Sequence, residues 1–270
     1  MRVWPELSPN FAVSHCPLSL SSLGALGHHD EQLLRLSAEH LPTLLKDMAP
    51  KGLSEMAAAF SRARLWIPSA LDALSGEAAV KAELFEPTHA AVLLAALGQM
   101  RWDHAAAVSA LVARLQMCIE EEMHWTAHNA SSYLANVALA MRGLSRLQSA
   151  SAAPCLAGLV RASDAFLVCP EEAASQDGTG DDAQWRTGAQ HYRDLAMMCN
   201  GMIDLDLRPT RTLLKHVQEM AQRAEEPLRR MEAAGQDAAP GVQQAHRERR
   251  AARRIRNELA DVARRWQVDG

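Results

Sequence analysis

The residues of this chain best suited to chemistry are arginines near its C-terminal end. Residues 246–270 hold eight arginines and four acidic residues, whereas the rest of the chain has a net charge of −8. A guanidinium donates two parallel hydrogen bonds to a phosphate, so the segment predicts contact with the phosphates of a nucleic acid. The arginines expected to make this contact are Arg247, Arg249, Arg250, Arg253, Arg254 and Arg256.

The same segment permits two other interpretations. Its apolar residues are spaced three and four apart, which predicts an amphipathic helix. They are Ala252, Ile255, Leu259, Val262 and Trp266. The helix could dock on an acidic protein surface, or it could be solvated with internal ion pairs such as Asp261 with Arg265. Only four of the 28 basic residues are lysine, and a GC-rich genome would also produce this bias towards arginine.

A second set of arginines recurs near the ends of predicted helices. They are Arg62, Arg64, Arg101, Arg142 and Arg146. These side chains could line one edge of the protein and follow an RNA backbone. A cation near a helix C-terminus also stabilises the helix by about 0.3–1 kcal/mol, so a purely structural role stays open.

Motifs for catalysis are absent from the sequence. It contains no glycine-rich phosphate loop and no G-x-S-x-G turn around a nucleophilic serine. His124 and His128, after Glu121, could share a helix face and hold a metal ion, but they fall at an expected helix junction. Asp204 and Asp206 fit a turn between helices. We therefore expect no catalytic residue, metal, cofactor or small-molecule substrate.

The cysteines and the hydropathy argue against a zinc-binding, a disulfide-bonded and a membrane-spanning protein. The five cysteines are scattered and include no C-x-x-C pair, so neither a zinc framework nor a disulfide scaffold is expected. A reducing compartment fits this pattern. No apolar run reaches the roughly 18 residues that a membrane-spanning helix needs, so we expect no membrane span.

The composition predicts an all-α protein. Hydrophobic residues make up 48% of the chain but aromatic residues only 4%, so the core must consist mainly of alanine, leucine, valine and methionine. Alanine and leucine favour helices strongly. A small-then-bulky step recurs at spacings of 34, 37 and 42 residues, which is typical of stacked helix pairs. The steps are Ala25-Leu26, Ala59-Phe60, Ala96-Leu97 and Ala138-Leu139.

The predicted architecture is an α-solenoid of about five helix pairs followed by a separate arginine-rich helix. A shift of 37 residues superposes the apolar residues of the second pair on those of the third, for example Phe60 on Leu97. Asp30 and Asp103 are the expected N-caps of two of the helices. The expected helices cover residues 18–27 and 30–45, 52–65 and 69–85, 87–100 and 103–123, 129–143 and 153–167, and 185–203 and 209–231.

The expected domain organisation follows from these helices and from the polar stretches between them. Residues 1–17 contain three prolines and are expected to be irregular. The remaining expected segments are four helix pairs over 18–169, an acidic mobile loop over 170–184, a fifth and divergent pair over 185–232, a linker over 233–245 and the arginine-rich helix over 246–270.

One pattern runs through three segments of the chain. It is an Ala- and Leu-rich helix, a short turn with an apolar residue, and a helix that opens on paired apolar residues. The segments are LSEMAAAFSRARLWIPSALDAL, THAAVLLAALGQMRWDHAAAVSALVARL and RDLAMMCNGMIDLDLRPTRTLLKHV. In this pattern residues 18–230 resemble the octotricopeptide and heptatricopeptide repeats of FAST-kinase-like and RAP-domain proteins. A RAP-type C-terminal domain would need strand-like segments, whereas the end of this sequence is expected to be helical.

This resemblance implies a fold that binds single-stranded RNA in mitochondria or chloroplasts, and some similar proteins are built into organellar ribosomes. The expected function is therefore that of a non-catalytic, RNA-binding subunit of the mitochondrial ribosome, in contact with rRNA and neighbouring proteins. The alternative is an α-solenoid scaffold or accessory subunit of another large mitochondrial complex, without RNA. The acidic body favours this alternative, because it would repel RNA unless its charges are segregated by face.

Overall fold

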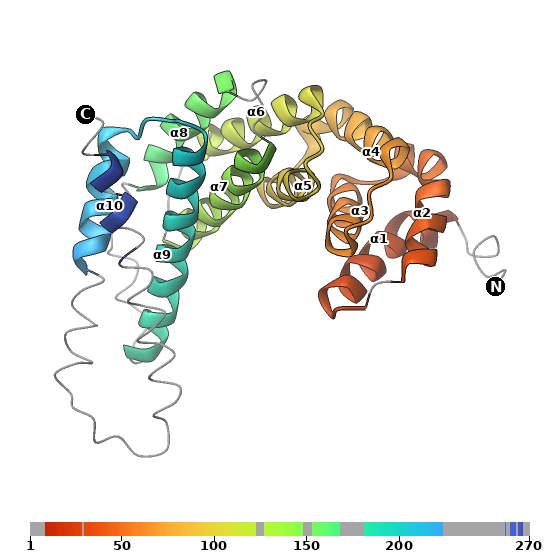
Figure 1. The fold of residues 1–270 in the computed structure, drawn as a ribbon, viewed down its shortest axis with the longest axis horizontal. Coiled ribbons are helices and arrows are strands. Elements are labelled where there is room, and N and C mark those ends of the chain that lie inside the picture. Colours follow the sequence, from red (N-terminus) through yellow and green to blue (C-terminus); the bar gives the residue numbers. More distant parts are fainter. Residues whose placement is uncertain are drawn as a thin grey trace, which may run out of the picture. The chain divides into compact units, whose positions relative to one another are not determined.

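The computed structural model describes residues 9–28, 30–122, 127–147, 153–167, 181–223, 257, 260–262 and 264–266. The regular elements among these residues are all helices, which confirms the predicted all-α class (Figure 1). The chain divides into two compact units. The first unit is Met1–Glu122 with Leu139–Ala162, and the second is Met123–Ala138 with Ser163–Gly270.

Three helix pairs make up most of the first unit. They are α1 (Pro9–Ala25) with α2 (Glu31–Leu44), α3 (Pro50–Ala63) with α4 (Pro68–Val80), and α5 (Pro87–Met100) with α6 (Ala105–Glu121). The first helices of the pairs contact one another in the order α1, α3, α5, and the second helices do so in the order α2, α4, α6. Such contacts are typical of stacked helix pairs. The full five-pair solenoid stays a prediction.

The three pairs share a period of 37 residues, because each first helix ends in the same left-handed turn. Gly27, Arg64 and Arg101 have positive φ and follow one another at intervals of 37. The residue after each of them donates its backbone N–H to a carbonyl five residues back, always at 2.9 Å. This is the Schellman pattern of helix ends. The three bonds run from His28 to Leu23, from Leu65 to Phe60 and from Trp102 to Leu97.

This period confirms the predicted register between the second and third pairs and corrects the register of the first. The small-then-bulky pattern aligns Ala25-Leu26 with Ala59-Phe60 at a spacing of 34 residues. The residue equivalent to Phe60 is Leu23, at a spacing of 37, and Leu26 is 75% exposed. An Ala-Leu step occurs on many helices, whereas the left-handed turn fixes the register.

The N-terminal boundary also differs from the prediction. Residues 1–17 were expected to be irregular, yet α1 begins at Pro9 and continues through Pro17. Proline fits the first turn of a helix because its missing N–H has no partner there anyway. Pro50, Pro68 and Pro87 open α3, α4 and α5 in the same way.

One predicted N-cap is confirmed and the other is wrong. The side chain of Asp30 accepts a hydrogen bond from Leu33 N at 3.0 Å and so caps α2. At α6 the cap is His104 instead of Asp103, and His104 Nδ1 accepts from Ala107 N at 3.2 Å. Residues 30 and 104 lie two periods apart, so the repeat decides which residue becomes the cap.

Cations of the second helices connect neighbouring pairs. Lys81 Nζ donates to the carbonyls of Leu45, Lys46 and Met48 at 2.7–2.9 Å and pairs with Glu77 at 2.9 Å. Two of these carbonyls belong to η2 (Leu45–Asp47), the 3-10 turn after α2. Arg114 Nε likewise donates at 3.1 Å to the carbonyl of Phe85, after η3 (Ala82–Leu84). These bonds add a cation to carbonyls at or just after the end of a helix.

The fourth pair is α7 (Ala127–Leu147) and α8 (Ala153–Leu167), and the boundary between the units falls within both helices. Helix α8 has the predicted bounds. Helix α7 is longer than the predicted 129–143.

The second unit contains α9 (Asp181–Asp204) and α10 (Arg211–Arg223). Residues 181–184 of the predicted acidic loop are therefore helical, and residues 170–180 lie outside the described residues. Asp206 has a positive φ, which confirms the predicted turn between α9 and α10. Thr210 caps α10 by accepting from Leu213 N at 3.0 Å, and its hydroxyl donates to Asp164 at 2.5 Å.

The C-terminal segment is described only in part. The predicted linker 233–245 lies outside the described residues. Within 246–270, residues 257, 260–262 and 264–266 are described, and all of them are helical. Val262, on the predicted apolar face, is buried, and Asp261 pairs with Arg264 instead of the predicted Arg265.

Candidate functional site

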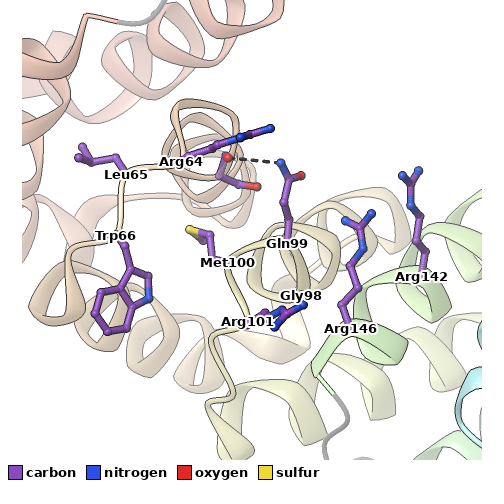
Figure 2. A pocket seen from close by; sticks show the side chains of 10 residues that line it. Arg64, Leu65, Trp66, Gly98, Gln99, Met100, Arg101, Arg142 and Arg146 are labelled. Carbon is purple, nitrogen blue, oxygen red and sulfur yellow. Dashed lines mark hydrogen bonds between the residues drawn. The ribbon is translucent and has the colours of Figure 1, made fainter.

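A pocket in the first unit gathers four arginines at the ends of helices that lie far apart in the sequence. Its volume is about 790 Å³. We name it the arginine pocket, after Arg64, Arg101, Arg142 and Arg146 (Figure 2). All four arginines are exposed, and the residues that line the pocket include no acidic side chain. Positive charge therefore dominates this surface.

Arg64 and Arg101 reach the pocket from the left-handed ends of α3 and α5. Arg64 has φ 53° and ψ 32°, and Arg101 has φ 52° and ψ 39°. The equivalent residue of the first pair is Gly27, the type that this conformation favours. A residue with a Cβ costs about 1 kcal/mol more there than glycine does. Two positions thus carry arginine at a cost in stability.

Arg142 and Arg146 reach the pocket because α7 and α5 cross in backbone contact. A Cβ built on Gly98 of α5 would lie 2.5 Å from Gly143 Cα, and one built on Gly143 would lie 2.7 Å from the Leu94 carbonyl carbon. Arg142 precedes Gly143, and Arg146 lies one turn after Arg142 on the same face of α7. Like charges four residues apart destabilise a helix by about 0.2–0.5 kcal/mol.

The arginines of this pocket have many donors to offer a ligand. Within the described residues, the side chains of Arg64, Arg101 and Arg146 take part in no hydrogen bond or ion pair. Each guanidinium carries five N–H donors in a fixed planar arrangement. The pocket can therefore bind oxyanions such as phosphate by paired hydrogen bonds.

An exposed aromatic ring lies beside these cations. Trp66 lines the pocket two residues after Arg64 and is 60% exposed. Its ring centroid lies 5.8 Å from that of Trp102, with an interplanar angle of 72°. Edge-to-face contact of this kind favours that orientation of the ring by about 0.5–1.5 kcal/mol. Trp66 was not among the predicted site residues, although a tryptophan follows each left-handed arginine within two positions, at 66 and 102.

The structure brings together some of the predicted arginines and not others. Arg64, Arg101 and Arg142 meet in the arginine pocket, together with Arg146. Arg62 does not line it, because its Nη1 donates to Ser21 O at 3.0 Å and to Ser21 Oγ at 2.8 Å, linking α3 to α1. The six tail arginines, Arg247, Arg249, Arg250, Arg253, Arg254 and Arg256, lie outside the described residues.

Other chemistry has little support in the described parts of the chain. No group of three or more His, Cys, Asp or Glu residues there could hold a metal ion. His124 and the side chain of His128 lie outside these parts. Burial raises the pKa of the Cys118 and Cys199 thiols, which makes them poor nucleophiles at neutral pH. None of the described helices has the length and apolarity to cross a bilayer.

Comparison with known proteins does not assign the chain to a family. No protein-family model matches the sequence, and no curated protein matches it. The arginine pocket is therefore the main basis for a functional proposal.

Proposed function

We propose that this protein is a non-catalytic RNA-binding helical-repeat protein that serves as a mitochondrial ribosome subunit in contact with rRNA and neighbouring proteins. The observation that carries the RNA-binding part is the arginine pocket, which is lined by four exposed arginines and by no acidic residue. The mitochondrial and ribosomal parts rest on the resemblance of its helix pairs to organellar RNA-binding repeats, and a chloroplast is the alternative location.

Local stability supports a functional role for these arginines. Two of them occupy left-handed positions that favour glycine, and two of them repel each other one helical turn apart. Positions that break local rules of stability without a structural gain are expected at functional sites. An RNA backbone would supply that gain, since each bound phosphate neutralises a guanidinium and releases counterions.

Several acids of the first unit lie away from the arginine pocket, which reduces their repulsion of a bound RNA. The acids Glu31, Glu77 and Glu121 form ion pairs on the second helices α2, α4 and α6. The arginine pocket lies at the ends of the first helices α3 and α5 and on α7. A phosphate that approaches the first-helix ends therefore meets the cations before the acids.

The test is a salt titration of RNA affinity with two charge-matched variants. Arg64→Gln/Arg101→Gln removes two pocket cations. Arg35→Gln/Arg161→Gln removes two exposed arginines outside the pocket. Binding of a labelled single-stranded RNA is followed by fluorescence anisotropy.

We expect the pocket variant to reduce the slope of log K against log [salt] by about 0.7 for each phosphate that no longer binds a guanidinium. The charge-matched control should keep a slope close to that of the wild type. Equal affinities and slopes for the two variants would remove the pocket from the proposal.

The arginine-rich segment 246–270, here called the tail, is tested with a separate variant, because its arginines are predicted to bind RNA independently of the pocket. Changing Arg249, Arg250, Arg253 and Arg254 to alanine should weaken binding further in both the wild-type and the pocket-variant backgrounds. Unchanged binding would end the proposed role of the tail and leave that of the pocket intact.

A second candidate function is that of a protein scaffold or accessory subunit without RNA. Val80, Leu84 and Met117 are large apolar side chains that are 80%, 68% and 45% exposed at the second-helix edge. Val80 and Met117 are 37 residues apart, so an exposed apolar side chain occurs at equivalent positions of α4 and α6. RNA-free native assemblies, together with partner loss in Val80→Glu/Met117→Glu, would favour the scaffold.

A further inference from the structure

We infer that the arginine pocket takes an unpaired nucleotide of single-stranded RNA, with its base stacked on Trp66 and its phosphates on the arginines. This inference rests on the proposed function and deepens it, since arginines alone would bind any polyanion. The added observation is an exposed indole in the wall of a pocket whose charged lining residues are all arginines.

Trp66 is placed to serve as a stacking surface. It lies in the turn between α3 and α4, and 60% of its surface is exposed. The edge-to-face contact with Trp102 favours one orientation of its ring, and most of the residue stays open to solvent. Stacking of a base on such a ring works with every base, because each base has a π-face.

The cations line the same pocket as Trp66, so the proposal places on them the phosphates on either side of the stacked base. In Figure 2, Trp66 lies on one side of the pocket, and Arg142 and Arg146 lie on the opposite side. Arg64 comes from the same turn as Trp66, and Arg101 from the equivalent turn of the next pair. A volume of about 790 Å³ falls within the usual range for small-ligand pockets and leaves room for a nucleotide.

The aromatic ring selects among polyanions. In a duplex the faces of an internal base are covered by its neighbours, so Trp66 can stack only on an unpaired or terminal base. A polyphosphate or an acidic peptide would satisfy the arginines but would leave the ring without a base. The geometry therefore favours single-stranded RNA over other anions.

The experiment compares probes that separate bases from phosphates. The full-length chain is titrated with a labelled single-stranded RNA, with an oligomer of the same length that lacks bases, and with a hairpin duplex of equal charge. The titrations are repeated with Trp66→Phe, Trp66→Leu and Arg64→Gln/Arg101→Gln, each also in the background of the four-alanine tail variant. Thermal melting of every variant checks that it is folded.

We expect the wild type to bind the single-stranded RNA about 5- to 100-fold more tightly than the base-free oligomer or the duplex. Trp66→Leu should lose most of this preference, and Trp66→Phe should retain most of it. The arginine variant should weaken binding to all three probes, including the base-free one.

Three results would overturn the inference. They are equal affinity for the base-free oligomer and the RNA, a full preference retained by Trp66→Leu, and displacement of the RNA by oligoglutamate as effectively as by unlabelled RNA. If the arginine variant still weakens RNA binding, the proposed function survives the loss of the tryptophan role. If the arginine variant has no effect on any probe, the pocket is removed from the proposed function as well, and the four-alanine tail variant then decides whether the protein binds RNA.

Discussion

Arg64 and Lys81 belong to the same helix pair, yet their side chains have opposite surroundings. The ammonium of Lys81 has three carbonyl partners and a carboxylate, whereas the guanidinium of Arg64 has no described partner. The next pair repeats the contrast, with Arg114 hydrogen-bonded to Phe85 O and Arg101 open to solvent. We call the side of the first unit formed by α2, α4 and α6 the second-helix edge, and the side formed by the C-terminal ends of α3 and α5 the first-helix edge. Cations at the second-helix edge hold the pairs together, and cations at the first-helix edge are available to a ligand.

The contrast shows that the surroundings of a cation indicate its role better than its presence near a helix end does. A helix C-terminus favours any nearby cation through the helix dipole. The helix dipole could explain why arginines occur at positions 64 and 101. It does not explain why both have a left-handed backbone or why their side chains make no described hydrogen bond or ion pair. Mutations at the two edges should therefore affect stability and RNA binding differently.

The largest effect is expected where the first-helix edge meets α7. Gly98→Ala places a Cβ against the backbone of Gly143, and neither backbone can yield easily. We expect the free energy of unfolding to fall by about 3 kcal/mol or more, measured by urea denaturation followed by circular dichroism.

The matched control for this substitution is Gly76→Ala in α4. A Cβ at Gly76 would meet no atom within 4 Å, so this change should stabilise the protein by about 0.5–1 kcal/mol. A loss below about 1 kcal/mol for Gly98→Ala would mean that the crossing is looser than described.

An intermediate effect is expected at the second-helix edge. Lys81→Met leaves three carbonyls and Glu77 without their shared cation, and we expect a loss of about 2–3 kcal/mol in the free energy of unfolding. RNA affinity of the folded protein should be unchanged, because Lys81 lies outside the arginine pocket. Lys46→Met, the same change at an exposed lysine, should fall within about 0.5 kcal/mol of the wild type. Weaker RNA binding by Lys81→Met would contradict the assignment of structural cations to the second-helix edge and of RNA-binding cations to the first-helix edge.

The smallest effect on stability is expected at the left-handed positions, and it has the opposite sign. Arg64→Gly and Arg101→Gly should each stabilise the protein by up to about 1 kcal/mol while weakening RNA binding. Gly27→Ala should cost a similar amount at the equivalent position, although a Cβ there meets no atom within 4 Å. Thermal melting and RNA titration of the same samples measure both quantities. Arginine-to-glycine variants that are less stable than the wild type would assign these arginines a structural role.

The sequence predicts the helices well, because their signals are local. Composition gives the all-α class, Asp30 gives an N-cap, and the apolar spacing gives the 37-residue register of the second and third pairs. The register of the first pair was missed because Ala25-Leu26 matches the apolar pattern as well as Ser22-Leu23 does. Gly27 and Arg64 lie 37 residues apart, but nothing in their side chains reveals that they share a backbone conformation.

The candidate site was less predictable, because non-local packing assembles it. Arg142 and Arg146 reach Arg101 only because α5 and α7 cross in contact at Gly98 and Gly143. Arg62, two residues before Arg64, is on a different side of α3 and binds Ser21 instead. The two arginines differ in the direction of their side chains at the end of α3. The spacing of residues along the sequence does not reveal this direction.

The open position at Gly27 bears on how such a protein can evolve. The turn there has the same left-handed backbone as the turns at Arg64 and Arg101, and the space beside it is empty. A single codon change to arginine would add a cation at this edge without disturbing a packed residue. Charge at the first-helix edge can thus be gained or lost one pair at a time, while the buried positions of the repeat stay the same.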